Sequence, residues 1–223
     1  TRDEIVAAIK DLLKTGDELK ILLTGIIDFE SGTVKGEPQF DVDEAKLIVE
    51  TAHDLGRRTF AHCSGLKGLE VAAAAGVDSV EHGFFMTRDI LEILAEKQIA
   101  WVPTFSPVHF QWARPEIAGW SEESIFNLKG ILDSHSEHIK MADEMGVPVV
   151  VGSDAGSHGV VHGVAGIDEI KFLVEAGMSM AKALNAATSL PRSLWGSTSA
   201  DIKPGDHVDI IGLSESPFEN TAM

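Results

Sequence analysis

The chain has 223 residues, of which 44% are hydrophobic, enough for one sizeable core or for part of a larger domain. Asp and Glu number 35 against 18 Lys and Arg, and the net charge of -17 opposes binding to nucleic acid or to an anionic membrane. Cys63 is the only cysteine, which excludes an intrachain disulfide and a zinc knuckle built from CxxC pairs. The sequence contains neither the apolar run of a membrane span nor the pattern of a signal peptide.

The chain is expected to open on a helix. Thr1 can cap its first turn, and Glu4 follows at the spacing of a capping box. Because a complete protein seldom begins on the cap of an internal helix, we expect that the sequence has been cut from a longer polypeptide.

Short apolar runs then alternate with amphipathic stretches, which predicts a repeated unit of a strand followed by a helix. We expect strands at 19–23, 58–61, 79–81, 99–102 and 147–152. Helices are expected near 43–55, 66–75, 87–97, 121–145 and 164–176. Glycines that can end helices in the left-handed conformation stand at 56, 76, 146 and 177. The alternation indicates a parallel sheet with helical crossovers.

Open doubly wound sheets and closed barrels share this alternation. Lys20, His62, His82 and Asp154 lie in or at the end of four different apolar runs, as expected where a barrel gathers its site from several strand ends. No GxGxxG or Walker sequence follows any of the strands. We therefore predict an α/β fold of the TIM-barrel type that holds about strands four to eight of the barrel. The first strand, at 19–23, would then lie at an unpaired edge.

The pattern changes after Thr188. A Pro204-Gly205 turn is followed by an alternating run, His207 to Ile211, which predicts a strand outside the barrel. We assign residues 1–198 to a partial barrel. Residues 199–223 are assigned to the C-terminal strand and tail of a small β-sandwich domain.

Three of the polar strand ends carry residue types that bind metals. His62 in TFAHCSG, His82 in SVEHGFF and Asp154 in VVVGSDAG each follow an apolar run and precede a glycine-containing turn. Imidazoles and carboxylates are seldom placed in a core without partners, so three of them at equivalent places favour a metal site. A single such histidine would more often be structural. Cys63 is interpreted as a packing residue because its strand position points it away from His62.

These motifs, together with LKILLTG, a later HG and ALNAATSLPRSLWG, resemble the amidohydrolase superfamily in its prolidase-like and imidazolonepropionase-like branch. The resemblance covers nearly the whole chain. It implies hydrolysis of an amide, ester or lactone by a metal-activated water, with two divalent ions, expected to be zinc, in the complete enzyme. Lys20 would be carboxylated and bridge the metals, His62 and His82 would bind one ion, and Asp154 would bind the other and transfer the proton.

Lys20 and a missing motif bear on the choice within this family. The mononuclear imidazolonepropionases and deaminases lack the bridging lysine, so Lys20 favours a binuclear peptidase-like or lactonase-like enzyme. The HxH pair of the family's first strand has no counterpart in this sequence. The alternatives are a mononuclear enzyme of the imidazolonepropionase or deaminase kind and a non-catalytic barrel fragment.

The remaining histidines are assigned to loops and helices. His162, in the loop after Asp154, is a candidate substrate-binding residue, as are His109 and Arg114, which we place in a long loop after the seventh strand. The histidines at 53, 135 and 138 are expected on solvated helix faces. The expected substrate is a small amide or dipeptide, in a homo-oligomeric protein that binds neither nucleic acid nor membrane. A cytoplasmic location is expected, with a secreted or periplasmic location as the alternative.

Overall fold

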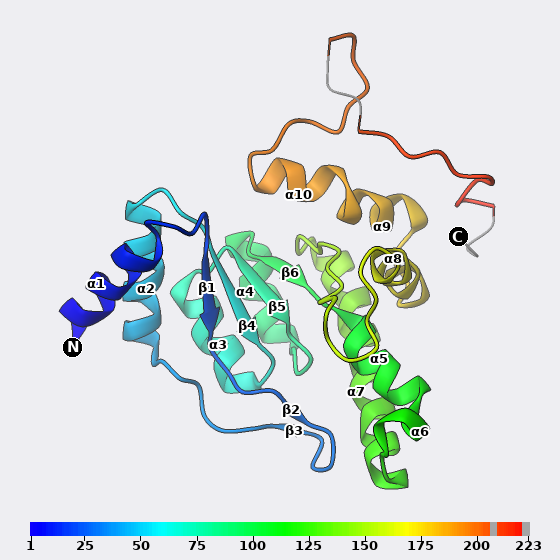
Figure 1. Ribbon diagram of the computed structural model, residues 1–223, viewed down its shortest axis with the longest axis horizontal. Helices are drawn as coiled ribbons and strands as arrows, with labels where there is room; N and C mark the ends of the chain where they lie inside the picture. The colour runs from blue at the N-terminus through cyan, green and yellow to red at the C-terminus, as the bar shows by residue number, and fades with distance from the viewer. Residues whose placement is uncertain (206–208, 220–223) are drawn as a thin grey trace.

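The computed structural model describes residues 1–205 and 209–219, and its centre is a parallel sheet. Its strands lie in the order β1-β4-β5-β6, and a short antiparallel pair, β2 and β3, lies outside it (Figure 1). The strands are β1 (Leu19–Leu22), β2 (Ile27–Asp28), β3 (Thr33–Val34), β4 (Thr59–Cys63), β5 (Ser79–His82) and β6 (Ala100–Val102).

Helices connect and cover these strands. The first half of the chain contains α1 (Arg2–Leu12), α2 (Val42–Asp54), α3 (Leu66–Ala75) and α4 (Arg88–Lys97). The second half contains α5 (Phe105–Ala113), α6 (Pro115–Ala118), α7 (Glu122–Met145), α8 (Ala165–Glu175), α9 (Met180–Ala187) and α10 (Ser189–Leu194). No helix in residues 1–205 and 209–219 is long and apolar enough to cross a membrane.

The helix boundaries follow from local chemistry. Thr1 and Glu4 form the predicted capping box of α1, and Asp41 forms a second one at α2. Gly76 and Gly146 end α3 and α7 in the left-handed conformation, which glycine adopts without the steric cost of a Cβ. The glycines predicted to stop helices all have positive φ.

One face of the sheet is covered by helices and carries most of the core. Helices α1 to α4 pack beside one another, and α4 contacts α7. Alternate strand residues point into this layer and are buried, among them Ile21, Ala61, Val80 and Trp101. Cys63 is also buried there, as its interpretation as a packing residue predicts.

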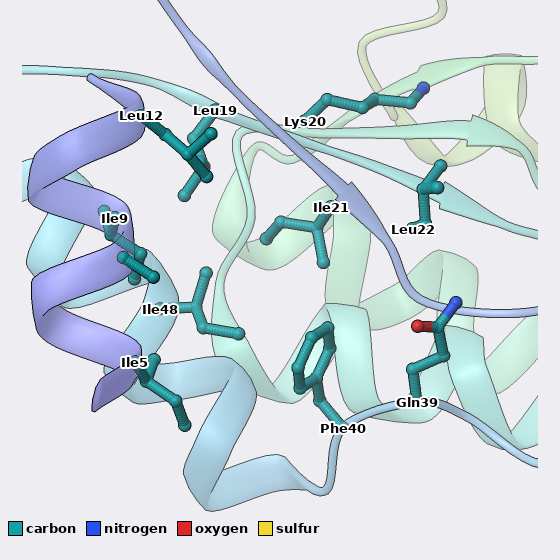
Figure 2. A pocket seen from close by; sticks show the side chains of 11 residues that line it. Ile5, Ile9, Leu12, Leu19, Lys20, Ile21, Leu22, Gln39, Phe40 and Ile48 are labelled. Atoms are coloured by element: carbon teal, nitrogen blue, oxygen red, sulfur yellow. The ribbon is translucent and has the colours of Figure 1, made fainter. Parts of the chain in front are cut away.

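The outer edge of β1 has no partner strand in the described part of the chain, as predicted. A groove of about 260 Å³ runs along this edge between β1, α1 and α2. Its walls are apolar, and Figure 2 shows Ile21, Ile48 and Phe40 pointing toward one another while Lys20 extends away from them. Leu12 and Leu22 at its rim are 62% and 56% exposed.

Several sequence predictions need correction. The run 147–152 is not a strand, because it pairs with β6 only through an isolated bridge between Trp101 and Val149. The predicted loop after β6 is mostly helical, since α5 occupies residues 105–113 and α6 occupies residues 115–118. The pair β2–β3 was not expected from the sequence.

The predicted C-terminal strand, His207 to Ile211, falls partly outside the described residues. The part that is described, 209–211, has no strand conformation. The division at residue 198 into a barrel and a sandwich domain therefore stays a prediction. Before this tail, Leu194 and Trp195 at the end of α10 pack on Val102 and Val150, on the side of the sheet away from the main core.

Candidate active site

The face of the sheet that helices α1 to α4 leave uncovered carries polar side chains. Lys20, His62 and Glu81 share this face, because the register aligns Lys20 with Phe60 and His62 with Glu81. All three are exposed or half-buried, whereas the residues that precede them, Leu19, Ala61 and Val80, are buried beneath the helices. The amine of Lys20 lies over the Phe60 ring, 4.8 Å from its centroid.

His82 reaches the same place by a backbone distortion. In a regular strand it would share the helix-covered face with Val80, which is fully buried. Its backbone is left-handed, with φ of 71°, and its imidazole lies edge to face with that of His62, with ring centroids 4.6 Å apart. Trp101 Nε1 donates a hydrogen bond of 2.9 Å to the His82 carbonyl oxygen and holds this turn. The structure therefore brings the two predicted histidines together.

Asp154 lies in an exposed loop, not directly after a strand as predicted. It follows the bridge residue Val149 and has a left-handed backbone with φ of 50°. Ser157 Oγ donates a hydrogen bond of 2.7 Å to Asp154 Oδ2, which fixes the carboxylate. Burial lowers the pKa of Lys20, His62 and His82, and the charge of Asp154 opposes this lowering in each, so the carboxylate lies within electrostatic reach of all three.

Desolvation favours the neutral forms of the basic groups. Burial, and to a smaller extent the nearby His62, lower the pKa of His82 to about 4. Burial also lowers the pKa of His62 and of Lys20, against opposing charges. Glu81 has a raised pKa because of burial, although Ser79 Oγ donates to it at 2.6 Å. Neutral imidazoles are the form that coordinates metals.

The donor types fit a divalent metal, but the ligand set in this chain is incomplete. His62 and His82 offer a pair of imidazoles beside an amine and a carboxylate. Within residues 1–205 and 209–219, no three His, Cys, Asp or Glu side chains lie close enough to hold one ion together. The histidine pair alone would therefore supply only part of a ligand set.

Two of the three predicted substrate-binding residues line one cavity. His109 and Arg114, from α5 and the residue after it, border a space of about 310 Å³ whose other wall includes Val161 and Phe172. The His109 ring packs 4.5 Å from that of Phe172, and burial lowers its pKa. His162 is exposed and does not line this cavity; it lies near Gly156.

One histidine assignment was wrong, and two residues near the site were missed. His135 is fully buried against Phe84 rather than solvated, and its Nε2 lies 3.0 Å from the Pro103 carbonyl oxygen. Glu81 directly precedes His82, and Thr104 Oγ1 lies 2.8 Å from His82 Nδ1. Both missed residues stand at or just after strand ends, the signal that singled out the histidines.

Comparison with known proteins assigns the family. The sequence pattern of the amidohydrolase family matches residues 2–221. The chain belongs to the amidohydrolase family. Ochratoxinase of Aspergillus niger is 32% identical over 186 residues, covering 82% of this chain and 38% of that protein. The match confirms the resemblance inferred from the strand-end motifs.

Solved structures show the same similarity. A Xaa-Pro dipeptidase with methionine bound in its active site is 29% identical with a TM-score of 0.83, over 98% of this chain and 54% of that one. A putative prolidase from Bifidobacterium longum is 26% identical with a TM-score of 0.84, over 99% of this chain and 56% of that one. This amidohydrolase chain thus spans about half the length of these structures, and its parallel sheet matches part of their fold.

Proposed function

We propose that this chain supplies part of the active site for metal-dependent hydrolysis of an amide C–N bond. The observation that carries the proposal is the His62–His82 pair, with ring centroids 4.6 Å apart, on the face of the sheet that also carries Lys20. Asp154, whose charge acts on all three, supplies the carboxylate. The similarity to a Xaa-Pro dipeptidase and to ochratoxinase supports hydrolysis as the reaction class.

His62 and His82 would hold one divalent ion, expected to be zinc. Lys20 in its carboxylated form would bridge this ion to a second one. The lowered pKa of Lys20 supports the carboxylation, because the neutral amine is the form that adds to carbon dioxide. A divalent ion in such a site polarises the substrate carbonyl and makes water more acidic. Asp154 would bind the second ion together with the HxH pair that the family carries on its first strand.

Asp154 would transfer the proton. Asp154 is exposed, so its carboxylate would be able to accept a proton from the attacking water and later donate it to the leaving amine. Ser157 holds one carboxylate oxygen by a hydrogen bond of 2.7 Å, which leaves the other oxygen free of that contact.

The proposed substrate is a small amide such as a dipeptide or an N-acyl amino acid. The cavity bordered by His109 and Arg114 is large enough for one side chain, and the guanidinium can pair with a carboxylate. His162 would contact substrate from the loop after Asp154. Methionine in the active site of the similar dipeptidase supports an amino-acid-like ligand.

The experiment assays a polypeptide that carries the family's HxH pair together with residues 1–223. Zinc-loaded protein is offered Xaa-Pro dipeptides, N-acyl amino acids and cyclic amides, and release of the amine is measured. We expect hydrolysis of at least one class, its loss after metal removal and its return on adding zinc. Hydrolysis that survives complete metal removal, or no hydrolysis of any class with zinc bound, would reject the proposal.

A further inference from the structure

Three residues around the candidate site have a strained backbone. Among the described residues other than glycine, positive φ occurs at His82, Gln98, Thr104 and Asp154. Gln98 ends α4, where a left-handed residue is common. Thr104 is the most unusual of the four because its branched Cβ disfavours the left-handed region. Strain of this kind persists only where surrounding contacts enforce it.

Contacts on both sides of Thr104 enforce this conformation. On one side, the buried His135 of α7 has its Nε2 3.0 Å from the Pro103 carbonyl oxygen. On the other side, the buried Glu169 of α8 accepts hydrogen bonds from the backbone N–H groups of Phe105 at 2.9 Å and Ser106 at 2.6 Å. The segment that follows β6 is therefore fixed from two helices.

These contacts also determine the hydrogen-bond partner of the Thr104 hydroxyl. Thr104 is the N-cap of α5, a position where a threonine hydroxyl usually accepts a hydrogen bond from the first turn of the helix. It makes no such bond here, because Glu169 already accepts from the first two N–H groups of the helix. The hydroxyl instead lies 2.8 Å from Nδ1 of His82.

We infer that Thr104 is a positioning residue for His82, and that the clamp formed by His135 and Glu169 holds it in place. The inference rests on the proposed role of His82 as a metal ligand. In the inferred arrangement, Thr104 Oγ1 accepts a hydrogen bond from Nδ1–H of His82, 2.8 Å away, so that Nε2 carries the free lone pair. Histidines that bind metals commonly donate their second N–H to a protein acceptor, which fixes both tautomer and ring orientation.

Three variants of Thr104 separate the effect of its hydroxyl from the effect of its strained backbone. Thr104→Val keeps the shape and the branched Cβ but removes the hydrogen bond, and Thr104→Ser keeps the hydroxyl. Thr104→Gly removes the hydroxyl and also relieves the strained backbone, so it covers the case in which the valine variant does not fold. If Thr104 acted only through its backbone conformation, Thr104→Gly would leave the tautomer of His82 unchanged.

The test measures the tautomer of His82 by long-range 1H–15N correlation in the metal-free chain, assigned with His82→Gln, and then the zinc affinity of each variant. We expect the Nδ1–H tautomer in the wild type and in Thr104→Ser, and a shift to the Nε2–H tautomer in the valine and glycine variants. Zinc affinity should fall about 10–100-fold in those two variants and be retained by the serine variant.

The two proposals fail in different ways. An unchanged His82 tautomer in folded Thr104→Val or Thr104→Gly overturns the positioning role, whatever the zinc affinity. If the wild type binds no zinc but the tautomer shifts as expected, the metal site is rejected while the positioning of His82 by Thr104 stands.

Discussion

The imidazoles of His62 and His82 lie edge to face across two neighbouring strands, with ring centroids 4.6 Å apart. His62 reaches this position from a regular strand, whereas His82 requires a left-handed turn that Trp101 holds through the His82 carbonyl. The proposed metal site therefore depends on the backbone after β5 as much as on the residue types.

Substitution of Gly83 tests this turn. A Cβ on Gly83 would lie 2.5 Å from Trp101 Nε1, at a φ of 65°. Gly76→Ala is the matched control, since Gly76 has a φ of 76° with nothing within 4 Å of its Cβ position. We expect Gly83→Ala to lower the free energy of unfolding by about 1–3 kcal/mol more than the control does, measured by urea denaturation. Equal losses would show that the contact with Trp101 does not constrain the turn.

Asp154→Asn tests the proposed proton transfer. The amide cannot accept a proton, so turnover of the metal-loaded polypeptide with the HxH pair should fall by about 10²–10⁴-fold, with the fold retained by circular dichroism. His53→Ala is the control and should leave turnover almost unchanged. His53 belongs to α2, and its Nε2 lies 2.8 Å from Asp78 Oδ2. A normal rate with normal metal content in Asp154→Asn would refute the role.

Glu169 gives a pH dependence of stability. Burial raises its pKa from 4.5 to about 7, so the folded chain binds a proton that the unfolded chain has already lost between these values. Its contribution to stability is complete below pH 4.5 and is lost as the pH rises to about 7, a change on the order of 3 kcal/mol. The difference in unfolding free energy between wild type and Glu169→Gln should fall over this range. A difference that does not vary with pH would contradict the raised pKa.

The unpaired edge of β1 predicts association of the 223-residue chain on its own. Its groove is apolar and Leu22 is 56% exposed at the rim, so Leu22→Lys should shift sedimentation toward the monomer. Phe126→Ser is the control, because Phe126 is 77% exposed on α7, away from this edge. A wild-type chain that sediments as a monomer would contradict the predicted association through β1.

The sequence predicted the alternation of strands and helices well because periodicity and glycine stops are local signals. Helix α5 was mistaken for a loop because Pro107 and Pro115 suggest irregular structure, although Pro115 stands at the first turn of α6, which tolerates it. The run 147–152 has the composition of a strand, yet strand pairing depends on neighbours that lie far away in the chain.

The site residues, too, divide into those with a local sequence signal and those that depend on contacts between distant parts of the chain. His62 and His82 were found because polar residues at strand ends are visible in the sequence, and their proximity follows from parallel pairing. His135 was missed because its helix carries many polar residues, and only its packing against Phe84 and Trp101 shows that it is buried. The roles inferred for Thr104 and Glu169 depend on tertiary contacts between α5, α8 and β5, which no local pattern encodes.

A calorimetric zinc titration of the 223-residue chain tests the metal site most directly. The wild type should bind no more than a single zinc ion tightly, and His62→Ala and His82→Ala should each weaken binding by at least about tenfold. His53→Ala should retain the wild-type affinity. Equal zinc affinity in the wild type and in the His62 and His82 variants would contradict the assignment of this pair as the metal site.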